Sequence, residues 1–121
     1  MANTYKEKYH AELSEELWRL NFAISHDELY IPQLEAIIVE RKATTETARE
    51  AYMEASKKYQ ETKKKEDRTA MKETAQAYDS AEKKVTDALN TLDQVSQKVN
   101  ISKMKADGIK KKIEYLESYE G

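Results

Sequence analysis

The sequence contains no cysteine, which excludes a disulfide framework, a thiolate metal site and a cysteine nucleophile. Proline occurs once and glycine twice, so the chain has little of the turn chemistry that a β-sheet protein needs. No stretch approaches the roughly 18 apolar residues of a membrane span, and the N-terminus has no apolar signal segment. We therefore expect a cytoplasmic protein with no membrane partner. The net charge of -2 creates no chain-wide field for nucleic acid or acidic lipid.

What the sequence does contain is abundant charge, at 36% of residues, and long heptad repeats. In its second half, uncharged residues recur at alternating spacings of three and four, which is the pattern of a coiled-coil seam. The members of this second seam are Met71, Thr74, Tyr78, Ala81, Val85, Ala88, Leu92, Val95, Val99, Ser102, Ala106, Ile109, Ile113 and Leu116. This half is predicted to be a long helix that lies against another helix.

A first seam with the same spacing runs through the other half of the chain. Its members are Leu13, Leu17, Leu20, Ile24, Asp27, Ile31, Leu34, Ile38, Arg41, Thr45, Ala48, Tyr52, Ala55, Tyr59 and Thr62. Pro32 lacks an N–H and should kink or break a helix, yet the heptad phase is unchanged across it. This favours one continuous arm kinked near Pro32. The alternative is a three-helix bundle, with a break at 25–31 and residues 4–25 folded back.

The heptad phase changes between Thr62 and Met71 by two residues, which is about 200° of helix rotation. The segment between them contains no apolar residue over 63–69, and Asp67 or Thr69 could cap a new helix. We therefore predict a single all-α domain over residues 1–121, folded as a long antiparallel two-helix hairpin. Its arms are expected at 4–65 and 69–119, with the turn at 66–68. Pairing about that turn would place residue i near residue 134 − i, with the more apolar ends of both arms at the open end.

Few residues are candidates for catalysis or metal binding. Glu7 and His10 have the Glu-x-x-His spacing of di-iron bundles, which need a second such pair. The other histidine, His26, has Ala23 at the corresponding position. A two-helix hairpin also offers no pocket in which a perturbed group could act as an acid, a base or a nucleophile. We therefore expect no catalytic residue, no metal and no cofactor, and a protein that is not an enzyme.

Two residues interrupt the pattern of the arms. Asp27 is the only carboxylate on the first seam, and it could pair with Lys103, Lys110 or a partner chain, unless a kink lets it reach water. Gly108 lies inside the second arm, where it costs about 1 kcal/mol relative to alanine. It could mark a bend, a close approach by another chain, or only a local weakness of the helix.

A second apolar stripe lies off the first seam and indicates an interaction surface. Trp18 and Phe22, the only tryptophan and the only phenylalanine, share a helical face with Leu29, and Ile37 follows. Leaving these four side chains in water would forgo about 1.5–3 kcal/mol each. We expect them to meet a second copy, a helical protein partner or a folded-back first helix. The sequence thus favours a structural or adaptor coiled coil that acts by homo-oligomerisation or partner binding at its apolar open end.

Two basic segments support a competing interpretation, a nucleic-acid-binding accessory protein. Residues 57–72 carry seven positive charges against three negative, and residues 98–112 carry six against one. Lysine clusters can bind phosphate backbones, although lysine also solvates helix surfaces in ordinary coiled coils. The candidate contacts are Lys63, Lys64, Lys65, Arg68, Lys110, Lys111 and Lys112.

Overall fold

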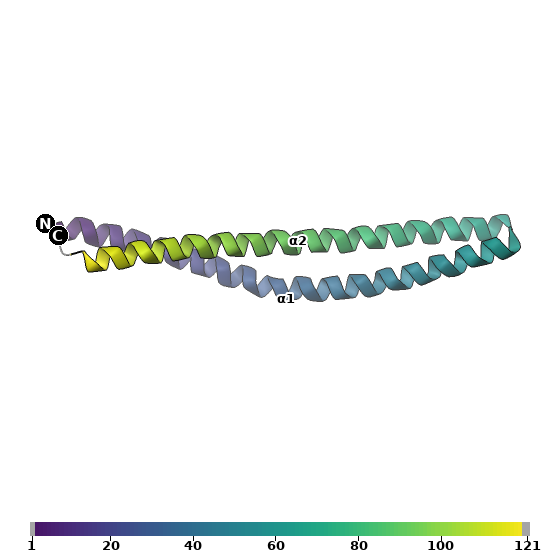
Figure 1. The fold of residues 1–121 in the computed structure, drawn as a ribbon, viewed down its shortest axis with the longest axis horizontal. Coiled ribbons are helices and arrows are strands. Elements are labelled where there is room, and N and C mark those ends of the chain that lie inside the picture. Colours follow the sequence, from purple (N-terminus) through teal and green to yellow (C-terminus); the bar gives the residue numbers. More distant parts are fainter. Residues whose placement is uncertain (1, 120–121) are drawn as a thin grey trace. The chain divides into compact units, whose positions relative to one another are not determined.

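The computed structural model describes residues 2–119 and consists of two long helices that pack against each other as a hairpin (Figure 1). Helix α1 spans Ala2–Thr62 with 61 residues, and helix α2 spans Lys65–Ser118 with 54 residues. No strand is present among residues 2–119. These two helices confirm the predicted all-α hairpin. The helical periodicity of both seams, which extends over their whole length, was the basis of that prediction.

The hairpin divides into two compact units, each containing a part of both helices. Unit 1 joins Met1–Ile31 with Gln94–Gly121, and unit 2 is Pro32–Asp93. The buried core side chains of unit 1 are Leu13, Ile24, Val99, Ala106 and Ile109. The buried core side chains of unit 2 are Leu34, Ile38, Ala81 and Ala88. All nine are members of the two seams, so the heptad repeat identified the buried face of each helix. That the chain forms one domain stays a prediction.

Helix α1 continues through Pro32 without interruption. The side chain of Pro32 is exposed, so the backbone carbonyl of Glu28, which loses its helical donor, can be solvated instead. Residues 4–25 form the first part of this helix, and the three-helix alternative is not needed. The kink at Pro32 stays a prediction.

The connection between the helices is Lys63 and Lys64, and the predicted turn at 66–68 instead forms the first turn of α2. Lys63 adopts the left-handed conformation, with φ of 54°, and its amide donates to the carbonyl of Tyr59 at 2.8 Å. This conformation ends a helix abruptly but is usually supplied by glycine or asparagine. A lysine gave no signal of it in the sequence.

The earlier turn changes which residues of the two helices lie at the same level. His10 meets Glu117, and Arg41 donates to the carbonyl of Lys84. The two numbers of these pairs sum to 127 and 125, so residue i lies near residue 125 − i to 127 − i rather than 134 − i. The difference is about one heptad. Because the seams repeat every seven residues, such a shift preserves the face that each helix buries while changing every partner along it. The predicted faces were therefore right and the predicted levels were wrong.

Candidate interaction surface

Three large apolar side chains lie on the outward side of α1 in unit 1, and we call Trp18, Phe22 and Leu29 the outer stripe of α1. Their exposed fractions are 66%, 64% and 71%. Phe22 lies two residues before the buried Ile24, a separation of about 200° around the helix. The rings of Trp18 and Phe22 stack with centroids 5.7 Å apart and an interplanar angle of 19°. The stripe therefore faces away from α2.

The fourth predicted member, Ile37, does not join this stripe. It belongs to unit 2, where it is half-buried beside the core residue Ile38. The strongly exposed aliphatic side chain of that segment is Val39, at 69%. The structure thus brings three of the four predicted interaction residues together and places Ile37 at the margin of the seam.

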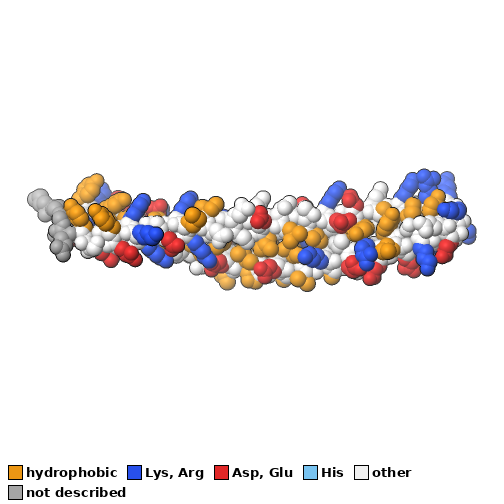
Figure 2. Space-filling model, viewed as in Figure 1, with side chains coloured by type: hydrophobic (Ala, Val, Ile, Leu, Met, Phe, Trp, Pro, Cys, Tyr) orange, Lys and Arg blue, Asp and Glu red, His pale blue; other side chains and the backbone are white. Residues whose placement is uncertain are grey.

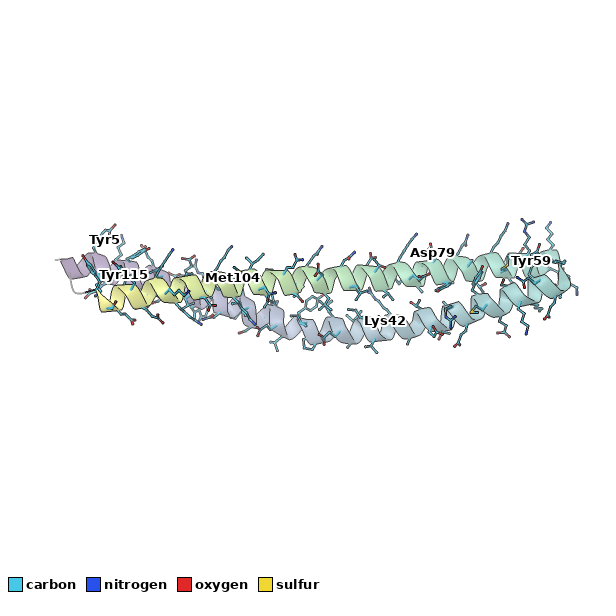
Figure 3. All side chains as sticks on the ribbon, viewed as in Figure 1. Tyr5, Lys42, Tyr59, Asp79, Met104 and Tyr115 are labelled. Carbon is cyan, nitrogen blue, oxygen red and sulfur yellow. The ribbon has the colours of Figure 1, made fainter. Side chains whose placement is uncertain are left out.

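Helix α2 has an outward apolar face in unit 1 as well, which we call the outer stripe of α2. It comprises Ile101, Met104, Gly108 and Tyr115, and Figure 3 labels Met104 and Tyr115 on this helix. The three large side chains are 53%, 74% and 68% exposed. A Cβ atom added to Gly108 would meet nothing within 4 Å, so no packing inside the chain requires glycine there.

The sequence contained the signal for the outer stripe of α2. Ile101 follows the buried Val99 by two residues, and Met104 and Gly108 flank the buried Ala106 at the same distance. A separation of two residues from the seam places a side chain on the opposite side of a helix. The off-seam positions of Ile101 and Met104 could be predicted from the sequence, whereas the place of Gly108 between them and Tyr115 was not predicted.

Ion pairs join the two helices of unit 1. The Lys98 ammonium lies 3.5 Å from the Asp27 carboxylate, and Lys103 pairs with Glu28 at 2.7 Å. The Asp27 side chain is only 15% exposed, and its Oδ2 accepts no hydrogen bond within the described residues. Asp27 therefore sits in the seam with one long ion pair to α2, and the neighbouring His26 Nδ1 lies 3.6 Å from its Oδ1. The expected partners Lys103 and Lys110 are replaced by Lys98 because the two helices are shifted in register.

Several exposed charges of unit 1 make no ion pair within residues 2–119. On α1 these are the acidic residues Glu7, Glu12 and Glu16, with Lys8 as the one basic residue. On α2 they are the basic residues Lys105, Lys110, Lys111 and Lys112, with the acidic residues Asp107 and Glu114. The unpaired exposed charges are therefore negative in sum on α1 and positive in sum on α2.

The other predicted basic residues lie at the turn, in unit 2, where Figure 2 shows lysine and arginine side chains gathered. The Lys63 ammonium lies 5.4 Å from the centroid of the Tyr59 ring. Lys64, Lys65 and Arg68 are exposed and make no ion pair within the described part of the chain. Lys110, Lys111 and Lys112 belong to unit 1, so the predicted nucleic-acid contacts fall into two separate groups.

The Glu7–His10 pair lines a shallow, open depression on unit 1. The His10 Nε2 lies 3.1 Å from a carboxylate oxygen of Glu117, and its Nδ1 lies 3.5 Å from the Ser14 hydroxyl. The imidazole is thus occupied by neighbours from both helices. In residues 2–119 no group of three or more histidine, cysteine, aspartate or glutamate side chains is arranged to hold a metal ion.

One carboxyl group has a clearly perturbed pKa. The Arg49 guanidinium donates two hydrogen bonds to Glu46, at 2.6 Å and 3.0 Å, which lowers the pKa of that carboxyl and raises the pKa of Arg49. Both groups are on the surface of α1 in unit 2 and one turn apart. An exposed ion pair of this kind explains the shift without a catalytic role.

Comparison of the chain with protein-family models, with curated proteins and with solved structures finds no match. Neither described helix contains a segment long and apolar enough to cross a membrane. Among the surfaces of the two helices, the outer stripe of α1 holds the only tryptophan and the only phenylalanine of the sequence, both exposed.

Proposed function

We propose that this protein is a non-enzymatic coiled-coil adaptor or structural protein. It acts through contact with a second copy or with a helical partner, at the end of the hairpin formed by unit 1. The observation that carries the proposal is the outer stripe of α1, because single exposed apolar residues are common whereas grouped ones mark interaction sites. The cytoplasmic location expected from the sequence stays a prediction.

The size of the stripe supports this interpretation. An aromatic side chain offers about 150–250 Å² for burial, so roughly 100–160 Å² remains available on each of Trp18 and Phe22. With Leu29 added, the exposed apolar area is on the order of 300–500 Å², which is the range of the functional patches found on monomeric proteins. Aromatic residues are also the ones that dominate association energies.

The proposal is tested by the double variant Trp18→Ala with Phe22→Ala. Sedimentation velocity at matched protein concentration should show that the variant loses the self-association of the parent, or that it no longer captures a partner that the parent binds. Helix content by circular dichroism should be unchanged, because neither ring belongs to the core of unit 1.

The matched control is Val39→Ala with Met53→Ala, which removes two side chains exposed by 69% and 54% in unit 2. This control should associate like the parent. If the Trp18 and Phe22 variant instead loses its thermal transition while the parent is a monomer, the two rings belong to the fold and the proposal is wrong.

A second candidate function is nucleic-acid binding at the turn. The observation that favours it is the exposure of Lys64, Lys65 and Arg68, with no acidic partner in the described residues. Changing Lys63, Lys64 and Lys65 together to glutamine should weaken binding of DNA or RNA. It should also flatten the dependence on salt, since each phosphate contact contributes about 0.7–0.9 to the slope of log K against log salt. No binding by the parent at low salt would remove this candidate.

A further inference from the structure

We propose that the occupant of the outer stripe of α1 is the outer stripe of α2 of a second copy, so that copies of this chain join head to tail. This rests on the proposed function and specifies its partner. Three observations favour a second copy over an unrelated helix: the shapes of the two stripes, their levels along unit 1, and their unpaired charges.

The two stripes have complementary shapes. Trp18 and Phe22 form a stacked, protruding ridge. Gly108 removes the side chain from the middle of the other stripe, between Met104 and Tyr115, and leaves open space above the helix. Glycine inside a helix is destabilising, and no packing among the described residues requires it at this position. A large ring from another copy can approach the backbone at that position, as knobs enter holes in coiled coils.

The stripes also lie at matching levels. The contacts of His10 with Glu117 and of Asp27 with Lys98 place residue i near residue 125 − i to 127 − i. Gly108 therefore lies at about the level of residues 17–19, and Met104 lies at about the level of residues 21–23. The ridge on α1 and the gap on α2 are therefore at the same height on opposite sides of unit 1. A second copy brought alongside without sliding places its gap against the ridge of the first.

Charge complementarity points in the same direction. The unpaired exposed charges of α1 in unit 1 are mostly acidic, at Glu7, Glu12 and Glu16 against Lys8. Those of α2 are mostly basic, at Lys105, Lys110, Lys111 and Lys112 against Asp107 and Glu114. Placing α1 of one copy on α2 of the next brings these opposite charges to the rim of the contact. Placing α1 on α1, or α2 on α2, would bring like charges together, which costs association free energy.

The arrangement has a consequence for symmetry. The two stripes face away from each other, so one copy can offer α1 to one neighbour and α2 to another. Such a heterologous interface does not close as a two-fold dimer and instead forms rings or open chains. A stable contact buries about 800 Å² on each partner. The apolar stripe supplies up to about half of that area, and the charged side chains beside it form the rim.

The test uses two variants of the full chain, each with one stripe blocked. Trp18→Ala with Phe22→Ala removes the ridge, and Gly108→Gln fills the gap. Gly108→Gln should leave the fold intact, because its Cβ meets open space and glutamine is the better helix former. Thr86→Gln, on an exposed position of α2 in unit 2, is the matched control.

By sedimentation velocity the parent and Thr86→Gln should form species larger than a dimer as concentration rises, whereas each blocked variant alone should be a monomer. An equimolar mixture of the two blocked variants should give a 1:1 heterodimer, since the intact ridge of one can bind the intact gap of the other. Raising the salt concentration should weaken that heterodimer.

Three results would overturn the inference. A parent that stays monomeric at every concentration excludes a second copy as the occupant, although a helical partner of another kind would still fit the proposed function. If the ridge variant dissociates but Gly108→Gln associates like the parent, the α1 stripe is an interface and the α2 stripe is not. If the mixture of blocked variants remains monomeric, the contact is not between the two different stripes.

Discussion

Replacing Asp27 with leucine is expected to stabilise the protein. Asp27 occupies a seam position of α1 in unit 1, with the core residue Ile24 one turn before it. Its side chain is 15% exposed, and its only nearby cation across the helices is the Lys98 ammonium at 3.5 Å. A carboxylate in this position loses hydration without gaining a hydrogen bond at Oδ2. A leucine there would complete the apolar seam.

The magnitude follows from burial and from the weakness of the ion pair. Fully burying a leucine side chain contributes about 1.5–3 kcal/mol, which falls slightly for a site that remains 15% exposed. Losing the pair with Lys98, which is 67% exposed, costs about 0–1 kcal/mol. Lys98 is left in water rather than buried, so no stranded charge opposes the change. The net effect is a gain of about 1–2 kcal/mol in the free energy of unfolding.

Urea unfolding followed by circular dichroism measures this gain. With a slope of about 2 kcal/mol per molar urea, the midpoint for Asp27→Leu should rise by about 0.5–1 M. Lys98→Ala serves as the comparison and should not raise the midpoint, because it leaves the largely buried Asp27 carboxylate without its pair on α2. If Asp27→Leu lowers the midpoint and Lys98→Ala lowers it by a similar amount, the ion pair stabilises the seam and the reasoning is refuted.

Two further predictions concern unit 2. Limited proteolysis with trypsin should cut first at Lys63 or Lys64, because these residues are exposed and lie between the helices; a first cut inside α1 or α2 would contradict the position of the turn. In a carboxyl titration by nuclear magnetic resonance, Glu46 should titrate below the ordinary range of a glutamate, and Arg49→Gln should return its pKa to that range. Since the pKa of Glu46 is lower in the folded chain, this pair stabilises the fold above the unfolded pKa and loses its effect as the pH falls through the folded pKa; a carboxyl that titrates normally in the parent would show that the pair does not persist in solution.

The sequence was sufficient to predict which side of each helix is buried. The seam runs unchanged across Pro32, and this correctly indicated that α1 continues there. The level of one helix against the other was not predictable, because a seven-residue repeat gives the same faces in registers that differ by one heptad. Only the turn fixes that level, and the residue that forms it, Lys63, has a left-handed conformation that its side chain does not favour.

The sequence was also sufficient to predict the members of the outer stripe of α1. Trp18, Phe22 and Leu29 were identified from their spacing, since three large apolar residues opposite a seam have no place in a two-helix core. Ile37 stands next to the seam rather than opposite it and is half-buried within the hairpin, and its part in an interface stays a prediction. The open space at Gly108 could be seen only in the structure, because the space around a missing side chain is not visible in a sequence.

The most direct test of the central claim is the intrinsic fluorescence of Trp18, the only tryptophan of the chain, over a dilution series. In the isolated chain this ring is 66% exposed. The emission maximum should therefore lie at long wavelength at high dilution and shift to shorter wavelength as association, or an added partner, removes the ring from water. An emission already at short wavelength in the monomer would contradict the account. So would an emission that stays at long wavelength while the protein forms oligomers or binds a partner.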